Sequence, residues 1–182
     1  NPGKKYEKTP HNAGFEVIDL LAKEALKCRL KRSFRFKARV GSAEYSENKV
    51  FLAKPLTYMN LSGFAAAGLL KYYRLVPSDL IVVLDDADLE SGRIRIRAKG
   101  GSGGHRGLAS IINAVGGTDF VRIRLGIGRN NDHGGLVEHV LRPMTAERRK
   151  EMEDAVNRAA DAALCVIREG VESAMNEFNG PC

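Results

Sequence analysis

The spacing of apolar side chains along the chain predicts four helices. Residues 11–26 carry Phe15, Ile18, Leu21, Ala22 and Ala25 at helical spacing, as in an amphipathic helix that buries one face against a sheet. Similar patterns predict helices over residues 62–73, 105–115 and 145–169. Thr145 opens the last of these and is a residue type that caps helix N-termini.

Strand patterns lie between these helices. Residues 33–40, 92–98 and 120–128 alternate between apolar and polar side chains, and residues 48–53 form another short strand. The segment "LIVVL" at 80–84 is apolar on both faces, which predicts a buried central strand. Because strands and helices interleave, the sequence predicts an α/β fold. We expect one domain over residues 1–182, with a twisted, mixed, mostly parallel sheet flanked by helices.

Length and composition narrow the class of protein. The chain has 182 residues, of which 43% are hydrophobic, enough for the core of one ordinary domain. Its apolar runs are far shorter than the roughly 18 residues of a membrane span, and no charged-then-apolar leader opens the chain. We therefore expect a cytoplasmic protein without membrane contact. The cysteines, Cys28, Cys165 and Cys182, show neither a disulfide framework nor a zinc pattern.

Positive charge is concentrated in the middle of the chain. The net charge is +7, and residues 93–129 contain one acid, Asp119, among these cations: Arg93, Arg95, Arg97, Lys99, Arg106, Arg122, Arg124 and Arg129. The alternation of residues 92–98 puts Arg93, Arg95 and Arg97 on one face of a strand. This pattern favours a polyanion such as nucleic acid as the partner. A solvated surface is the alternative.

A glycine-rich segment, "KGGSGGHRG" at 99–107, follows that strand. It lacks the Gly-Lys-Ser/Thr ending of a P-loop, and no Gly-x-Gly-x-x-Gly follows the first strand, so we expect no nucleotide cofactor. Its glycines would let the backbone approach a bulky ligand, and the next helix would direct free N–H groups at an oxygen or phosphate. A purely structural turn fits the same residues.

The segment "DDAD", Asp85 to Asp88, directly follows the buried strand. In open α/β sheets, ligands bind beyond the carboxyl ends of the strands. Clustered carboxylates there could hold a divalent metal, or one of them could support a histidine base. An exposed acidic turn is the third interpretation.

Two further residues suggest hydrolysis by an activated water. His11 lies at a helix start, where the helix dipole disfavours its protonation and suits a neutral base, although capping or exposure would explain it too. Asn60, in "KPLTYMNLSG", could hold an amide or an oxyanion. The chain has no Gly-x-Ser-x-Gly nucleophile elbow, which favours water as the nucleophile.

Five blocks of sequence resemble the bacterial-type peptidyl-tRNA hydrolase family. They occur in order along almost the whole chain: "NPGKKYEKTPHNAGF", "KPLTYMNLSG", "DDADLESGRIRIR", "GGSGGHRGL" and "FVRIRLGIGR". The resemblance implies a monomeric, metal-independent and cofactor-free esterase in the cytoplasm. Such an enzyme cleaves the ester between peptide and tRNA in peptidyl-tRNA and so recycles tRNA from stalled or aborted translation, with no obligatory protein partner.

The resemblance also implies roles for individual residues. His11 would be the base that activates water, Asp85 the carboxylate that supports it, and Asn60 a group that stabilises the transition state. The expected substrate contacts are Asn1 to the blocked amino group, Tyr6 and Tyr58 to the tRNA end, and Met59, His105 and Arg106 along the substrate cleft. The expected phosphate contacts are Arg95, Arg97 and Arg124.

The chain departs from the family pattern at three places. Arg106 stands where family members usually have asparagine, and Pro10 stands where arginine is common. Family members also begin with a buried apolar strand that runs into a glycine-rich turn before "NPG". We therefore expect a first β-strand upstream of residue 1.

Two other functions fit part of the sequence. A non-catalytic RNA-binding relative of the same fold would use the basic face without hydrolysis. A metal-dependent phosphoesterase would use Asp85, Asp86 and Asp88 as ligands. The set Asn1, His11, Asn60 and Asp85 favours catalysis, because RNA binding alone does not require it.

Overall fold

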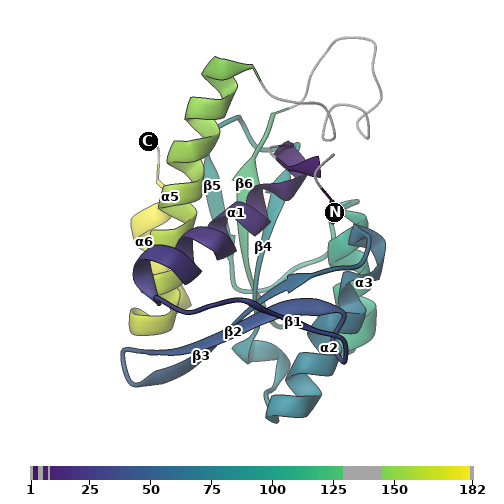
Figure 1. The fold of residues 1–182 in the computed structure, drawn as a ribbon. Helices are drawn as coiled ribbons and strands as arrows, with labels where there is room; N and C mark the ends of the chain where they lie inside the picture. The colour runs from purple at the N-terminus through teal and green to yellow at the C-terminus, as the bar shows by residue number, and fades with distance from the viewer. Residues whose placement is uncertain (1, 4–5, 8, 129–144, 181–182) are drawn as a thin grey trace.

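The computed structural model describes residues 2–3, 6–7, 9–128 and 145–180. One three-stranded sheet contains β4 (Ile81–Asp86), β6 (Val121–Gly126) and β5 (Ile94–Arg97) in that order. β4 runs parallel to β6, and β5 runs antiparallel to it. The fold is therefore α/β, with this sheet at its centre (Figure 1).

Helices cover both faces of the central sheet. On one face lie α1 (Ala13–Leu20) and α5 (Ala146–Glu169), which pack their apolar sides on Ile94, Ile96 and Ile123. A short turn, η2 (Pro10–Asn12), leads into α1, and a wider turn, η3 (Leu21–Ala25), continues it. On the other face α3 (Arg106–Val115) packs Leu108 and Ile111 against Leu84 and Phe120.

A second sheet extends the molecule on one side. It consists of β1 (Lys31–Ser33), β2 (Ala38–Tyr45) and β3 (Asn48–Pro55), all antiparallel. After β3, the short helix η4 (Met59–Leu61) leads into α2 (Ser62–Tyr73), which packs beside α3. A turn, η5 (Pro77–Asp79), then connects α2 to β4.

Two expectations about the strands are wrong. The described sheets are not mostly parallel, because only the β4–β6 pairing is parallel and the other three are antiparallel. Residues 33–40 are not one strand either, since a turn at residues 34–37 separates β1 from β2. An apolar or alternating pattern reports which faces of a strand are buried and carries no information about the direction of its neighbour.

Other expectations are confirmed with small shifts at their ends. The helices predicted at 62–73, 105–115 and 145–169 correspond to α2, α3 and α5, and the Thr145 hydroxyl caps α5 by accepting from the amide of Arg148. Cys165 is buried in α5. No helix in the described part of the chain combines the length and the apolarity that a membrane span requires.

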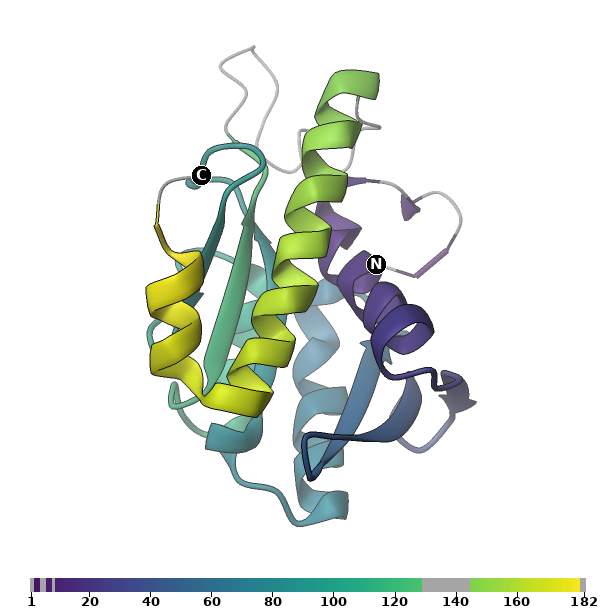
Figure 2. The ribbon, with the colours of Figure 1, turned by 90° about the vertical axis from the view of Figure 1, so that its left-hand side faces the viewer.

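A final helix, α6 (Val171–Phe178), was not predicted. It follows α5 at Gly170, whose φ of +89° favours glycine, and it lies beside β5 (Figure 2). The side chain of Asn179 then pairs with the outer edge of β5, accepting from the amide of Ile96 at 2.7 Å and donating to its carbonyl at 3.1 Å. This amide covers a sheet edge that would otherwise be open.

Candidate active site

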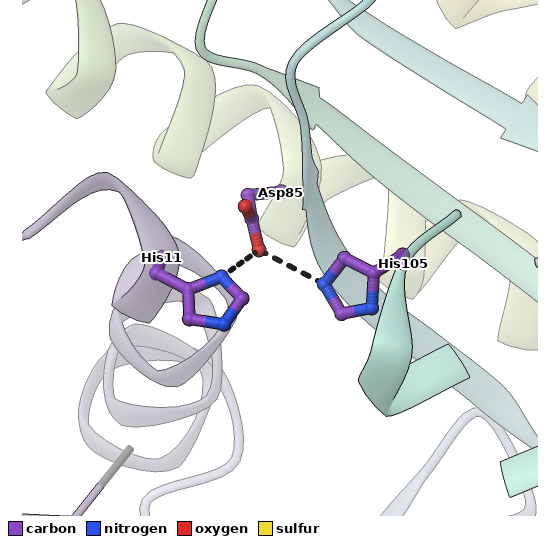
Figure 3. Close-up of side chains that lie close together, drawn as sticks. All are labelled: His11, Asp85 and His105. Carbon is purple, nitrogen blue, oxygen red and sulfur yellow. Dashed lines mark hydrogen bonds and ion pairs between the residues drawn. The ribbon is translucent and has the colours of Figure 1, made fainter. Parts of the chain in front are cut away.

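Two histidines share one buried carboxylate at the end of β4. Nδ1 of His11 lies 2.8 Å from Oδ1 of Asp85, and Nε2 of His105 lies 3.2 Å from the same oxygen. Figure 3 shows both rings directed at this oxygen from opposite sides. The carboxylate is 5% exposed, while the imidazoles of His11 and His105 are 15% and 12% exposed. Solvent and substrate can therefore reach the histidines but not the carboxylate behind them.

The surrounding hydrogen bonds assign the proton positions on both rings. Nδ1 of His105 accepts from the amide of Leu108 at 3.1 Å, so its proton lies on Nε2 and is donated to Asp85. His11 likewise donates from Nδ1 to the ionised carboxylate, which leaves a lone pair on its Nε2. Nε2 of His11 can therefore accept a proton. His105 could accept one only on Nδ1, which would break its hydrogen bond with the amide of Leu108 and uncap α3.

Asp85 keeps its negative charge despite its burial. Burial raises the pKa of this carboxyl, but the hydrogen bonds from His105 and His11 outweigh it and hold the pKa well below its usual range. The depressed pKa stabilises the folded state above about pH 4, the ordinary value for aspartate, and this stabilisation is lost as the pH falls further. A carboxylate charged throughout the physiological range can stabilise a protonated His11 during a reaction.

Close approaches of backbone place the two histidines. A Cβ on Gly14 would clash with the carbonyl oxygen of Val83, so glycine allows the start of α1 to lie directly against β4. His11, one turn earlier, thereby reaches Asp85. His105 is placed by its position as the N-cap of α3. Neither distance could be derived from the sequence, because His11, Asp85 and His105 are separated by 74 and 20 positions.

Most of the other predicted site residues lie in the described part of the chain. Met59 lies against Gly107, where a Cβ would come within 2.5 Å of its sulfur. Tyr58 is 62% exposed, and Asn60 is exposed and has no hydrogen bond to another described residue. Arg106 is exposed at the start of α3, and Tyr6 is half-buried before His11. Asn1 lies outside the described residues.

The predicted phosphate contacts lie on one face of the central sheet. Arg95 on β5 is opposite Arg124 on β6, and Arg97 is opposite Arg122. Arg95 and Arg97 are exposed, and Arg124 forms an ion pair with Asp86 at 3.0 Å. Like charges directly opposite each other are unfavourable in a sheet, so this arrangement favours an anionic ligand. Arg122, the fourth member, was not among the predicted site residues.

The carboxylates of "DDAD" do not converge as a metal site would require. Asp86 is engaged by Arg124 and accepts from the amide of Asp88 at 3.0 Å. Two groups in the described part of the chain have donor atoms close enough for a metal: His11, Asp85 and His105, and Cys165, Glu169 and Glu177. Neither group contains Asp86 or Asp88. The expected ligand set of a metal-dependent phosphoesterase is therefore not assembled.

The histidines line one part of a larger cavity. This cavity has a volume of about 570 Å³ and also contains Met59 and Gly107. It continues between β3 and β4, where its lining includes these apolar residues: Val50, Leu52, Ile81, Val83, Ala65 and Leu69. A polar, reactive end and an apolar body thus belong to one concave space.

Comparison with known proteins agrees with this geometry. The family model described as peptidyl-tRNA hydrolase matches residues 1–182. The chain belongs to this family. The curated peptidyl-tRNA hydrolase of Desulforudis audaxviator is 51% identical over 180 residues, which cover 98% of this chain and 89% of the relative. That of Caldanaerobacter subterraneus subsp. tengcongensis is 48% identical, covering 99% and 96%.

A solved structure shares the fold of this family member. The crystal structure of peptidyl-tRNA hydrolase from Acinetobacter baumannii has a TM-score of 0.93 and 33% identity, covering 99% of this chain and 91% of that one. The resemblance noted in the sequence is confirmed. Membership of a hydrolase family also disfavours a purely RNA-binding protein.

Two substitutions of His105 distinguish its contact with Asp85 from its contact with the amide of Leu108. In His105→Asn the amide oxygen can still accept from Leu108 and cap α3, but the shorter side chain cannot reach Asp85. In His105→Ala both contacts are lost. We expect kcat to fall about tenfold in both variants, because the carboxylate behind His11 loses a positioning partner. The free energy of unfolding should be about 1 kcal/mol higher for the Asn variant than for the Ala variant, because the Asn variant keeps the helix cap.

The carboxyl resonance of Asp85, followed by NMR from pH 1 to pH 6, provides the second measurement. Its pKa should rise toward the usual range in both variants, because one of two stabilising hydrogen bonds is missing. An unchanged Asp85 titration together with unchanged kcat would show that His105 only caps the helix.

Proposed function

We propose that this protein hydrolyses the ester that joins a peptide to the terminal ribose of tRNA, with His11 as the base. The observation that carries this proposal is the Asp85–His11 hydrogen bond of 2.8 Å, in a site open to solvent and in a chain of this family. The products are a free peptide and a tRNA that can be charged again.

The reaction can be written with the residues of the site. Nε2 of His11 takes a proton from water while the water oxygen attacks the ester carbonyl carbon and the carbonyl electrons move to its oxygen. The amide of Asn60, which is exposed, donates to this oxyanion. The intermediate then collapses, the bond to the ribose oxygen breaks, and the proton on His11 passes to that oxygen. Asp85 balances the charge of the transient imidazolium.

We propose the substrate contacts on the basis of the family resemblance. Tyr58 presents an exposed ring on which an unpaired base of the tRNA end can stack. Tyr6 serves the same end, while Met59, His105 and Arg106 border the peptide. Asn1, outside the described residues, contacts the blocked amino group. Arg95, Arg97 and Arg124 bind phosphates and position the RNA without reading its sequence.

The proposed reaction needs no metal, cofactor or partner protein. Water activated by His11 suffices as the nucleophile, so we propose hydrolysis without a metal or cofactor. We also propose that the protein acts as a monomer in the cytoplasm, without an obligatory protein partner.

Release of tRNA from N-acetyl-aminoacyl-tRNA in EDTA tests this function, with unblocked aminoacyl-tRNA as the comparison. The protein should cleave the blocked substrate selectively. His11→Ala should lower kcat at least 100-fold, because general-base assistance is lost, while tRNA binding changes less than twofold. Equal loss of binding and turnover would contradict the role of His11. Tight binding without cleavage by the unaltered protein would instead support the RNA-binding alternative.

The phosphate face predicts a change in salt dependence. Arg97→Met should weaken tRNA binding about tenfold, because a hydrogen bond to a charged group contributes roughly 1.5–3 kcal/mol. It should also reduce the slope of log K against log salt by about one. Arg39→Met is the matched control, since Arg39 is an exposed strand arginine of the other sheet. Equal slopes in the Arg97 and Arg39 variants would remove Arg97 from the RNA face.

We also propose that the apolar part of the cavity receives one more strand. Among the described residues β3 pairs only with β2, and β4 pairs only with β6. Their free edges border the cavity, which α1 and α2 close with Phe15, Ile18, Leu69 and Leu70. Unpaired strand edges leave amides and carbonyls without partners. An extended apolar segment upstream of residue 1 would pair with both edges and join the sheets.

Hydrogen exchange provides the test. In a polypeptide extended upstream by the family's first strand, the free-edge amides of β3 and β4 should exchange at least tenfold more slowly than in residues 1–182. Amides of the β1–β2 pairing serve as the control and should not change. Equal exchange at the β3 and β4 edges in both polypeptides would show that the segment does not occupy the cavity.

A further inference from the structure

Arg122 is a buried cation that has no hydrogen-bond acceptor among the described residues. Its side chain is 2% exposed, and Nε, Nη1 and Nη2 find no hydrogen-bond partner within the described part of the structure. The guanidinium stacks on the ring of Phe120, whose centroid lies 4.3 Å from the guanidinium carbon. A stacked ring leaves the N–H groups in the guanidinium plane free to donate.

The surroundings of Arg122 add positive rather than negative charge. Arg97 lies directly opposite it on β5, and Arg124 is two positions along β6. Asp86, the acid on this side of the sheet, is paired with Arg124. Burial, followed by the Arg124 cation, lowers the pKa of Arg122 from its ordinary value. An unpaired buried charge is unfavourable for folding, so packing alone does not explain an arginine here.

The glycine-rich segment lies over these guanidinium groups. A Cβ on Gly100 would lie 3.8 Å from Nη1 of Arg122, and one on Gly103 would lie 3.1 Å from Nη2 of Arg124. Both glycines have positive φ, +148° and +56°, so larger residues are disfavoured by conformation as well as by space. Because glycines carry no side chain, this segment is a thin cover, and its displacement would expose Arg122 to a ligand.

We propose that Arg122 binds a phosphate group beneath residues 100–104, as an inner site behind the exposed Arg95 and Arg97. A guanidinium with all its donors free matches the oxygens of phosphate in a bidentate manner. The inference deepens the proposed function, because an RNA phosphate is the ligand that the substrate supplies. Free inorganic phosphate has the same chemistry and serves as the probe that is independent of RNA.

Arg122→Met tests the proposal, because a ligand-binding role and a structural role of Arg122 predict opposite changes in stability. Methionine preserves the packing on Phe120 and removes the buried charge, a change that is often neutral or stabilising. If Arg122 is a ligand-binding residue, the urea midpoint without anions should stay the same or rise. The increase of that midpoint produced by inorganic phosphate in the unaltered protein should disappear. Affinity for tRNA should fall about tenfold, and the salt slope should decrease by about one.

Two variants complete the design. Arg122→Lys keeps the charge without the planar fork, so it should retain the salt slope and lose part of the phosphate effect. Arg39→Met removes an exposed strand arginine and should leave the phosphate effect unchanged. A lower urea midpoint in Arg122→Met, or failure to fold, would assign Arg122 a structural role and overturn the proposal. Persistence of the phosphate effect in Arg122→Met would overturn it as well.

The measurements distinguish a failure of the Arg122 site from a failure of the proposed function. Loss of the phosphate effect with unchanged tRNA affinity would support the site and assign it to free phosphate rather than RNA phosphate. If the unaltered protein neither binds nor cleaves peptidyl-tRNA, the proposed function fails. The phosphate-dependent stabilisation would still decide the role of Arg122.

Discussion

The site depends on the single buried oxygen that His11 and His105 share. Oδ1 of Asp85 accepts from both imidazoles, at 2.8 and 3.2 Å. Burial raises the pKa of this carboxyl, and these two bonds hold it below its usual range, so the carboxylate stays charged. The same bonds connect three parts of the fold: the turn before α1, the carboxyl end of β4 and the N-terminus of α3. Catalytic geometry and local packing are therefore stabilised by one interaction.

His105 links this centre to the glycine-rich segment. It caps α3 through Leu108 and lies directly after Gly103 and Gly104. The segment that covers Arg122 and Arg124 therefore ends at His105, which donates a hydrogen bond to Asp85. One continuous piece of backbone thus connects the arginine face to the hydrogen bond between His105 and Asp85.

The arginine face brings like charges together at a cost in stability. Arg95 faces Arg124, and Arg97 faces Arg122, across a single strand pairing. Such pairings are unfavourable in a sheet without an anion, and the burial of Arg122 adds to this cost. A protein selected only for folding would be expected to hold apolar or oppositely charged residues at these positions.

Local periodicity was sufficient to predict most elements of the fold. It located α2, α3 and α5, because each carries a continuous apolar face, and the alternation "RIRIR" placed Arg95 and Arg97 on one side of β5. The motifs also brought His11, Asp85 and Asn60 into one hypothesis, through family resemblance. α6 was missed because the helical pattern was followed only to Glu169.

Tertiary structure alone decided strand direction, the turn inside residues 33–40 and the partners of the polar groups. Phe36 in that turn is buried against Tyr72 and Tyr73, a contact between segments that no local pattern relates. Likewise, the sequence showed four arginines on two strands but not that Arg122 is buried with no hydrogen-bond acceptor among the described residues. Periodicity specifies which face of an element is buried. Distances between elements depend on how those faces pack, and that determines which charges meet.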